Sequence, residues 1–118
     1  MQDLHLPHRA PLRFARQIIS KGKDNARVLV KFDEIPSLAM LIEAAAQSSA
    51  AFGDGSAKMG FLVSLKNVKL TKKASRKNLE VEVHNEHNLE SMKYINFEVF
   101  EDEESLANGS LVVSLRAT

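Results

Sequence analysis

The sequence predicts an α+β fold in which a curved antiparallel sheet wraps around one buried helix. Three observations lead to this prediction: an apolar helical stretch at residues 35–52, a strand hairpin before it, and three or four alternating strand patterns after it. One helix combined with a run of antiparallel strands is typical of a fold in which the helix covers one face of the sheet.

The chain before the helix is expected to hold coil and a hairpin. Residues 1–11 contain two of the three prolines and two of the four histidines, which favours a coil or a short turn. Residues 12–20 fit either a strand or a short helix, residues 21–25 have the composition of a turn, and residues 26–32 are rich in β-branched side chains. We therefore expect a hairpin that ends in a strand at residues 26–32.

The chain is organised around this central helix. Its apolar stripe, at i, i+3, i+4 and i+7 spacing, consists of Leu38, Leu41, Ile42, Ala45, Ser49 and Phe52. Pro36 is expected in the first turn, Ser37 or Asp33 as the cap, and Gly53 with Gly55 at the end. The opposite face carries alanines and a methionine rather than charges, so the helix is expected to be buried on nearly every side. Because one curved sheet covers one side only, we expect a second copy to cover the other side across a two-fold axis. The predicted assembly is a homodimer or an oligomer of such dimers.

After the helix the spacing at which apolar residues recur changes from 3.6 residues to 2. Strands are predicted at residues 59–70, 79–83, 92–100 and 111–115. Turns are predicted at residues 72–78, 85–88, 101–104 and 108–109. The alternation changes phase inside residues 59–70, which indicates a β-bulge. The acidic turn at residues 101–104 is expected to be solvated.

Length, composition and charge exclude several classes of protein. The 118 residues fit one domain, 1–118, and a net charge of +1 argues against binding nucleic acid through its phosphates. Without cysteine there is no disulfide, thiolate nucleophile or zinc–thiolate site. Neither a secretory signal nor a membrane span is expected, because the N-terminus lacks an apolar core and residues 35–52 are half alanine and serine. The expected location is the cytoplasm, and the spacing of the histidines and the absence of a glycine-rich loop predict no metal and no cofactor.

Three stretches resemble a known family. They are L-P-H-R-A-P at residues 6–11, L-I-E-A-A-A-Q at residues 41–47, and residues 62–70 with the turn that follows. The first two are similar to the motifs L-P-H-R-x-P and L-x-E-A-x-A-Q of the 3-hydroxyacyl-acyl carrier protein dehydratases, which have the hotdog fold. The resemblance implies a dimeric hotdog domain that holds an acyl thioester, or a similar apolar ligand, along the helix at the subunit interface.

The sequence departs from this family just before the helix. The family has H-F-P-G-x-P-x-x-P-G there, and its histidine is half of the catalytic pair. Residues 30–37 read V-K-F-D-E-I-P-S, which keeps only Phe32 and Pro36 and has no histidine. Removing the C2 proton and protonating the leaving hydroxyl at C3 need two acid/base groups. We therefore expect that dehydratase activity has been lost.

Glu43 is the candidate catalytic residue, with Gln47 one turn later on the same face. A single helix carboxylate acts as base or nucleophile in other hotdog branches, so Glu43 could activate water for thioester hydrolysis. The alternative is a structural role in which Glu43 pairs with Arg9, Arg13 or Lys31, or lies at the dimer interface. Gln47 is interpreted either as a group that orients the carboxylate or binds a ligand carbonyl, or as a satisfied buried amide.

Two further sets of residues complete the predicted site. The ligand-binding candidates are Phe32, Pro36, Ser37 and Leu38. The candidates for docking acyl carrier protein or coenzyme A are Lys69, Lys72, Lys73, Arg76 and Lys77, and the alternative is a merely basic solvated turn. Three hypotheses remain open: an acyl-thioester-binding protein, an acyl thioesterase that uses Glu43, and a non-catalytic structural or regulatory dimer.

Overall fold

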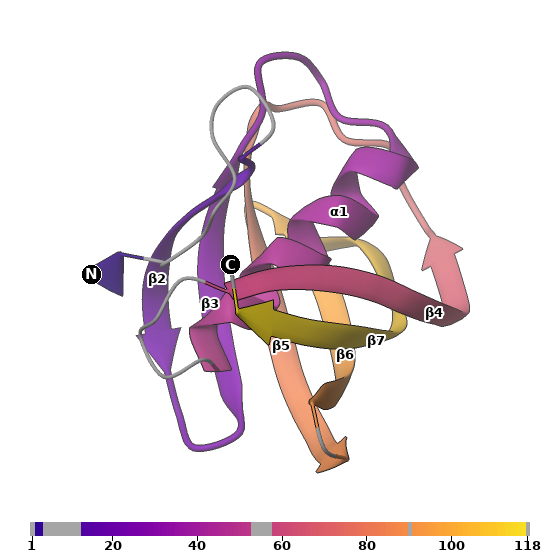
Figure 1. The fold of residues 1–118 in the computed structure, drawn as a ribbon. Helices are drawn as coiled ribbons and strands as arrows, with labels where there is room; N and C mark the ends of the chain where they lie inside the picture. Colours follow the sequence, from indigo (N-terminus) through magenta and orange to yellow (C-terminus); the bar gives the residue numbers. More distant parts are fainter. Residues whose placement is uncertain (1, 4–12, 53–57, 90, 118) are drawn as a thin grey trace.

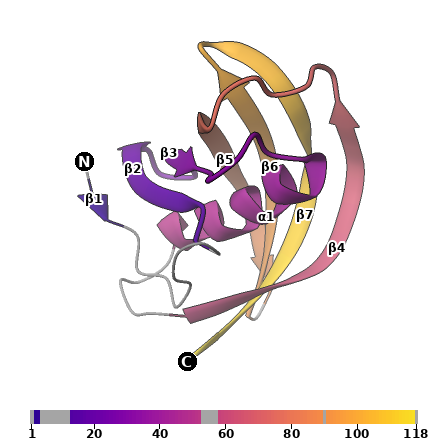
Figure 2. The ribbon, with the colours of Figure 1, turned by 90° about the horizontal axis from the view of Figure 1, so that it is seen from above.

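One helix lies in the curve of a seven-stranded antiparallel sheet (Figure 1). The structure is a computed structural model, and it describes residues 2–3, 13–52, 58–89 and 91–117. In chain order the elements are β1 (Gln2–Asp3), β2 (Ala15–Lys21), β3 (Asn25–Lys31), α1 (Leu38–Ser48), the 3₁₀ helix η1 (Ser49–Phe52), β4 (Lys58–Leu70), β5 (Asn78–Leu89), β6 (Met92–Glu101) and β7 (Glu104–Ala117). The strand order across the sheet is β1-β2-β3-β5-β6-β7-β4, so β4 lies at one edge (Figure 2). The predicted architecture, a curved antiparallel sheet around one helix, is confirmed.

The predicted hairpin is formed by β2 and β3. Residues 15–21 are a strand rather than a helix, and the hairpin closes where Gly22 donates its N–H to the Asn25 carbonyl at 2.8 Å. Beyond β3 the sheet continues directly to β5, with Val28 opposite Val81. The helix is therefore the connection between β3 and the second group of strands.

The helix begins at Leu38, after Ser37, which is one of the two caps that the sequence predicts. Ser37 is the N-cap: it has extended backbone angles, and its Oγ accepts the N–H of Met40 at 3.3 Å. Pro36 therefore precedes the cap instead of occupying the first turn, which corrects that expectation. Gly53 and Gly55 lie outside the described residues.

Burial of α1 is one-sided within a single chain. Leu41 and residues 44–49 are buried, whereas Ala39 is exposed and Leu38, Met40 and Ile42 are half-buried. The expectation of burial on nearly every side is therefore not met by one chain alone. The N-terminal half of the helix is therefore partly exposed to solvent.

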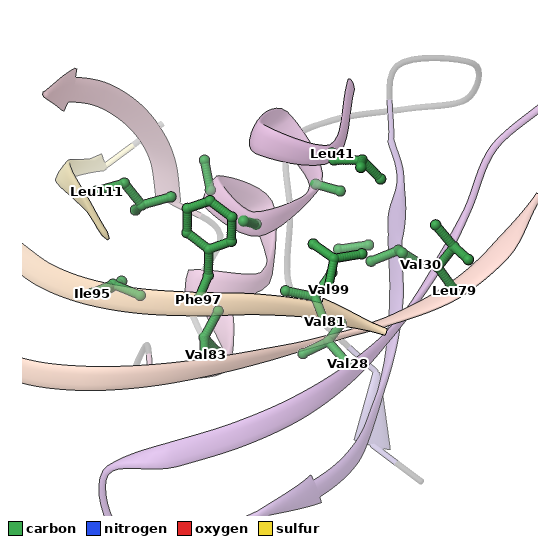
Figure 3. Close-up of a cluster of buried hydrophobic side chains, with 14 of the residues drawn as sticks. Val28, Val30, Leu41, Leu79, Val81, Val83, Ile95, Phe97, Val99 and Leu111 are labelled. Atoms are coloured by element: carbon green, nitrogen blue, oxygen red, sulfur yellow. The ribbon is translucent and has the colours of Figure 1, made fainter. Parts of the chain in front are cut away.

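The core is a layer of apolar side chains between the sheet and α1 (Figure 3). The inward residues of four central strands are Val28, Val30, Leu79, Val81, Val83, Ile95, Phe97, Val99, Leu111 and Val113. Ala44 and Ala45 are fully buried against this layer, and their small side chains let the helix lie close to the sheet. Burying each of these valine or leucine side chains stabilises the folded state by about 1.5–3 kcal/mol.

The bulge predicted in residues 59–70 is confirmed, and β4 has two of them. Its register against β7 shifts between Leu62 and Ser64 and again between Lys66 and Lys69. Asn67, inside the second shift, has a positive φ of 54°. Each bulge adds one residue to β4, which bends the strand around the helix.

Two predicted turns are strand. Residues 85–88 belong to β5 and residues 108–109 to β7. The glycine at 109 is instead required by a close approach: a Cβ there would lie 3.0 Å from the Cα of Val68. The turn predicted at residues 101–104 is confirmed, and its two central residues, Asp102 and Glu103, both have positive φ, as a two-residue type I′ turn requires.

Candidate functional site

Gln47 connects the helix to the start of β2. Its side chain is 3% exposed. Its Oε1 accepts the N–H groups of Phe14 at 2.7 Å and Ala15 at 3.1 Å, and its Nε2 donates to Glu43 Oε1 at 3.3 Å. The amide therefore satisfies two backbone donors and holds the carboxylate from one side, and its carbonyl oxygen is already engaged.

Glu43 is half-buried and lies in the partly open half of α1. Its neighbours one turn away include Ala39 and Met40, which keep apolar surface exposed. A carboxylate in this position can accept a proton or a hydrogen bond from a molecule that lies along the helix.

A small hollow of about 180 Å³ lies at the start of the helix. It brings together three of the four predicted ligand-binding residues, namely Pro36, Ser37 and Leu38, with Lys73 at its wall. Phe32 is not part of it. That ring is buried in the core, 4.9 Å from the ring of Phe14, so Phe32 does not line the hollow.

The basic segment at residues 69–77 is tied to the acidic turn between β6 and β7. Lys72 Nζ lies 2.7 Å from Glu104, and Arg76 lies 2.6 Å from Asp102. The hydrogen bond and charge of Glu104 raise the pKa of Lys72 above its ordinary value. Two of the five predicted docking cations are thus paired within the chain.

The other three docking cations keep their charge available. Lys69, Lys73 and Lys77 are exposed and have no ion pair with another residue of the described chain. Lys73 also lines the hollow at the start of the helix.

Glu101 was missed by sequence reasoning, which assigned the whole acidic turn to solvent. Its side chain is 7% exposed and accepts three hydrogen bonds: from Ser75 N at 2.8 Å, from Ser75 Oγ at 2.8 Å and from Arg76 N at 3.0 Å. The backbone and hydroxyl donors of Ser75 hold the pKa of this carboxyl below its usual value. The period of two would have placed Glu101 inward, because it continues the buried series at 95, 97 and 99.

Two of the four histidines lie on β5, at its exposed end. His84 and His87 are both exposed, and the inward residues of β5 are Leu79, Val81 and Val83. His84 projects from the outer side of the sheet, since side chains alternate along a strand, and His87 stacks on Tyr94, whose neighbour Ile95 points inward. The sheet therefore separates both rings from Glu43. His5 and His8 lie outside the described residues.

No helix among the described residues is both long and apolar enough to cross a bilayer.

The sequence matches no protein-family model and no curated protein. The structure, in contrast, is similar to several solved structures. The dehydratase heterocomplex ApeI:P from Xenorhabdus doucetiae has a chain that matches with a TM-score of 0.77 at 17% identity, over 97% of this chain and 90% of that one. An HP0420 homologue from Helicobacter felis matches with a TM-score of 0.68 at 16% identity, over 95% and 84% of the two chains. A hypothetical thioesterase from Streptococcus pneumoniae, solved with coenzyme A, matches with a TM-score of 0.66 at 9% identity, over 86% of each chain.

Proposed function

We propose that this chain, which has the hotdog fold found in dehydratases and thioesterases, binds an acyl thioester or a similar apolar ligand along α1 without dehydrating it. The ligand would lie where a second copy of the chain completes the cover of the helix.

The observation that carries the proposal is apolar surface left open on the inner side of the molecule. Leu62 and Leu65 of β4 are 39% and 42% exposed. Leu65 pairs with the buried Leu111, so its side chain is on the same side of the sheet as the helix. The half-buried Met40 and Ile42 of α1 add to this surface. An open apolar surface of this kind marks a ligand site or a subunit interface.

The edge of β4 supports a homodimer. This strand has 13 residues and pairs with β7 on one side, and its other side faces no strand of the described chain. A long edge strand with apolar side chains is a ready template for pairing with another chain. Two copies joined antiparallel along β4 would extend the sheet and bring the open side of each α1 toward the partner.

Loss of dehydration is supported by the positions of the histidines. Reversible dehydration needs a second acid/base group within hydrogen-bond reach of the substrate, besides Glu43. His84 and His87 are on the wrong side of the sheet, and the segment before α1 contains no histidine. The chain thus keeps a carboxylate in place while the residue that would complete the pair is missing from that segment.

The carrier would be recognised at the start of the helix. Lys73 is exposed and lines the hollow formed by Pro36, Ser37 and Leu38, and Lys69 and Lys77 are further exposed cations of the same basic segment. Both acyl carrier protein and coenzyme A present a phosphate ahead of the thioester, and lysine side chains attract such a group.

Binding and assembly are tested together on the purified protein. Decanoyl-CoA is titrated by calorimetry, and the molar mass is measured by light scattering after size-exclusion chromatography. We expect a dimer that binds decanoyl-CoA better than free coenzyme A, and a Leu65→Arg variant that is monomeric and binds at least tenfold more weakly. Ile19→Arg is the matched control, because Ile19 is also exposed but lies on β2. A wild-type monomer, or equal affinity for decanoyl-CoA and coenzyme A, would contradict the proposal.

A second candidate function is thioester hydrolysis with Glu43 as the base. It is favoured by the hydrogen bond from Gln47, which orients the carboxylate. The N–H groups of Leu38 and Ala39 at the start of α1 lie about 6–8 Å along the axis from Glu43, at 1.5 Å per residue, and the side chain points back toward them. A water molecule can fill the remaining gap and attack a carbonyl polarised by those N–H groups. Release of free coenzyme A from decanoyl-CoA that disappears in Glu43→Gln would establish this activity.

The third hypothesis, a structural or regulatory dimer without a ligand, predicts a different result in the same experiments. The light-scattering mass would be that of a dimer, decanoyl-CoA would not bind, and Glu43→Gln would change stability alone.

A further inference from the structure

A separate hollow of about 510 Å³ lies on the outer side of the sheet, away from α1. Its lining comes from four strands and includes Lys66, Glu86, Tyr94, Asn96, Ser110 and Val112. The buried Ile95 and Leu111 point toward the helix, so their neighbours along β6 and β7 project to the other side. A volume of this size is within the range of small-molecule sites.

Three polar side chains in this hollow form a directed chain of hydrogen bonds. Ser110 Oγ donates to Asn96 Oδ1 at 2.6 Å, and Asn96 Nδ2 donates to the Glu86 carboxylate. An amide cannot take up a proton, so the chain does not activate the serine as a nucleophile. It fixes the orientation of three groups, and the Ser110 lone pairs, one Asn96 N–H and the second Glu86 oxygen take no part in these two bonds.

One wall of the hollow, formed by His87, Tyr94 and Val112, is largely apolar and lies beside these polar groups. The rings of His87 and Tyr94 are stacked, with centroids 4.2 Å apart and planes at 12°. Val112 is the cross-strand partner of Tyr94 on its other side. Within the described chain the Tyr94 hydroxyl has no hydrogen-bond partner, so the wall ends in a free polar group.

The lining of the hollow contains one positive side chain, Lys66, and one negative side chain, Glu86. Lys66 is exposed and has no ion pair with another described residue, and Glu86 lies across the hollow from it with one carboxylate oxygen still open. A ligand carboxylate would be attracted by Lys66 and repelled by Glu86, and the reverse holds for a ligand ammonium, so a singly charged ligand gains little net attraction. The balance favours a neutral ligand.

We propose that this hollow binds a small neutral ring that carries several hydroxyl groups, such as a monosaccharide. Each hydroxyl both donates and accepts, which matches the alternating acceptors and donors of Glu86, Asn96, Ser110 and Lys66. The C–H face of the ring packs against the wall formed by Tyr94 and Val112. The proposal is independent of the acyl-binding function, since pairing along the edge of β4 lies in the plane of the sheet and leaves its outer side open.

The test is an NMR titration of the ¹⁵N-labelled full chain. The probes are the methyl glycosides of glucose, galactose and mannose, with hexanoate and phenylalanine as an anion and a zwitterion. At least one glycoside is expected to bind in the millimolar range and to shift the amide signals of Lys66, Asn96 and Ser110, while hexanoate and phenylalanine do not.

Variants separate the site from the rest of the sheet. Ser110→Ala and Asn96→Ala are each expected to weaken glycoside binding about fivefold, because each removes one or two ligand hydrogen bonds. Ser114→Ala is the matched control: it lies on the same strand and face but outside the lining. The amide spectrum reports whether each variant is folded, and Tyr94→Phe, which keeps the stack, replaces any that is not. Binding of hexanoate or phenylalanine instead, shifts confined to α1, or no shift with any glycoside would overturn the proposal.

Discussion

Replacing Glu101 by glutamine is the sharpest test of how the basic segment is held. The carboxylate is nearly buried and receives three hydrogen bonds, two from the backbone of Ser75 and Arg76 and one from the Ser75 hydroxyl. Glutamine has the same shape, and its remaining oxygen can keep both backbone bonds. The charge is lost, however, and the new NH₂ group faces the Ser75 hydroxyl, which must rotate to accept.

The expected change in the free energy of unfolding can be worked out from these three hydrogen bonds. A hydrogen bond to a charged group is worth about 1.5–3 kcal/mol and a neutral one about 0.5–1.5 kcal/mol. Losing charge assistance on three bonds, with partial compensation, should lower the free energy of unfolding by about 2 kcal/mol. Glu101→Ala, which leaves two backbone N–H groups without acceptors, should cost about 3 kcal/mol.

Urea unfolding followed by circular dichroism measures this effect at a fixed protein concentration. With a slope of about 2 kcal/mol per molar urea, the midpoint of Glu101→Gln should fall by about 1 M at neutral pH. Glu104→Gln is the matched control. Its ion pair with Lys72 is exposed on both sides, so its midpoint should move much less.

The difference in stability between wild type and Glu101→Gln should also depend on pH. The pKa of Glu101 is lower in the folded protein than its ordinary value of 4.5, so its stabilisation is complete above that pH and is lost as the pH falls through the folded-state pKa. The difference between wild type and Glu101→Gln should therefore shrink in acid. A difference that stays constant down to about pH 3, or an equal loss in Glu104→Gln, would refute the reasoning.

Three further substitutions test the fold around the site, each by thermal or urea unfolding. Gly109→Ala should cost about 1–3 kcal/mol, because its Cβ would lie 2.9 Å from Val68 Cγ2 and 3.0 Å from the Val68 backbone. Gln47→Ala should cost about 2–3 kcal/mol, because the backbone N–H groups of Phe14 and Ala15, at the start of β2, lose their acceptor. Ser37→Ala should cost about 1 kcal/mol through loss of the helix cap on Met40.

Each of these predictions has a comparison within the chain. Gly22→Ala should be tolerated better than Gly109→Ala, since its Cβ would meet only the flexible Asn25 side chain. Gln17→Ala, at a half-buried position on β2, should have a small effect beside Gln47→Ala. Ser37→Asp should retain the stability that Ser37→Ala loses, because aspartate caps a helix equally well. The opposite order in any pair would contradict the contact on which that prediction depends.

Local sequence patterns were reliable where one face of an element is buried. The period of 3.6 in the helix and the alternation in β3, β5 and β6 arise because the core selects apolar side chains on one face only. The phase change in residues 59–70 likewise located a bulge, since an extra residue must reverse which side chains point inward. The family resemblance added the hotdog architecture, which the solved structures bear out at the level of the fold.

The turn signals at residues 85–88 and 108–109 failed because strand pairing overrides local preference. Residues 85–89 gain a partner in β6, and the glycine at 109 is used for its small size beneath Val68 rather than for a positive φ. The real hairpin turn carries positive φ at Asp102 and Glu103, neither of them glycine, because the pairing of β6 with β7 requires it.

The sequence by itself determined the helix, most of the strands and the presence of a single carboxylate, Glu43, on an apolar helix. Only the tertiary structure decided what surrounds them. Gln47 is engaged by the backbone of β2, Glu101 anchors the loop at Ser75, and the two histidines of β5 are separated from Glu43 by the sheet. The residues in each of these relations are 26 or more positions apart in the chain. Periodicity reports only which face of an element is buried and carries no information on the partner that this face meets.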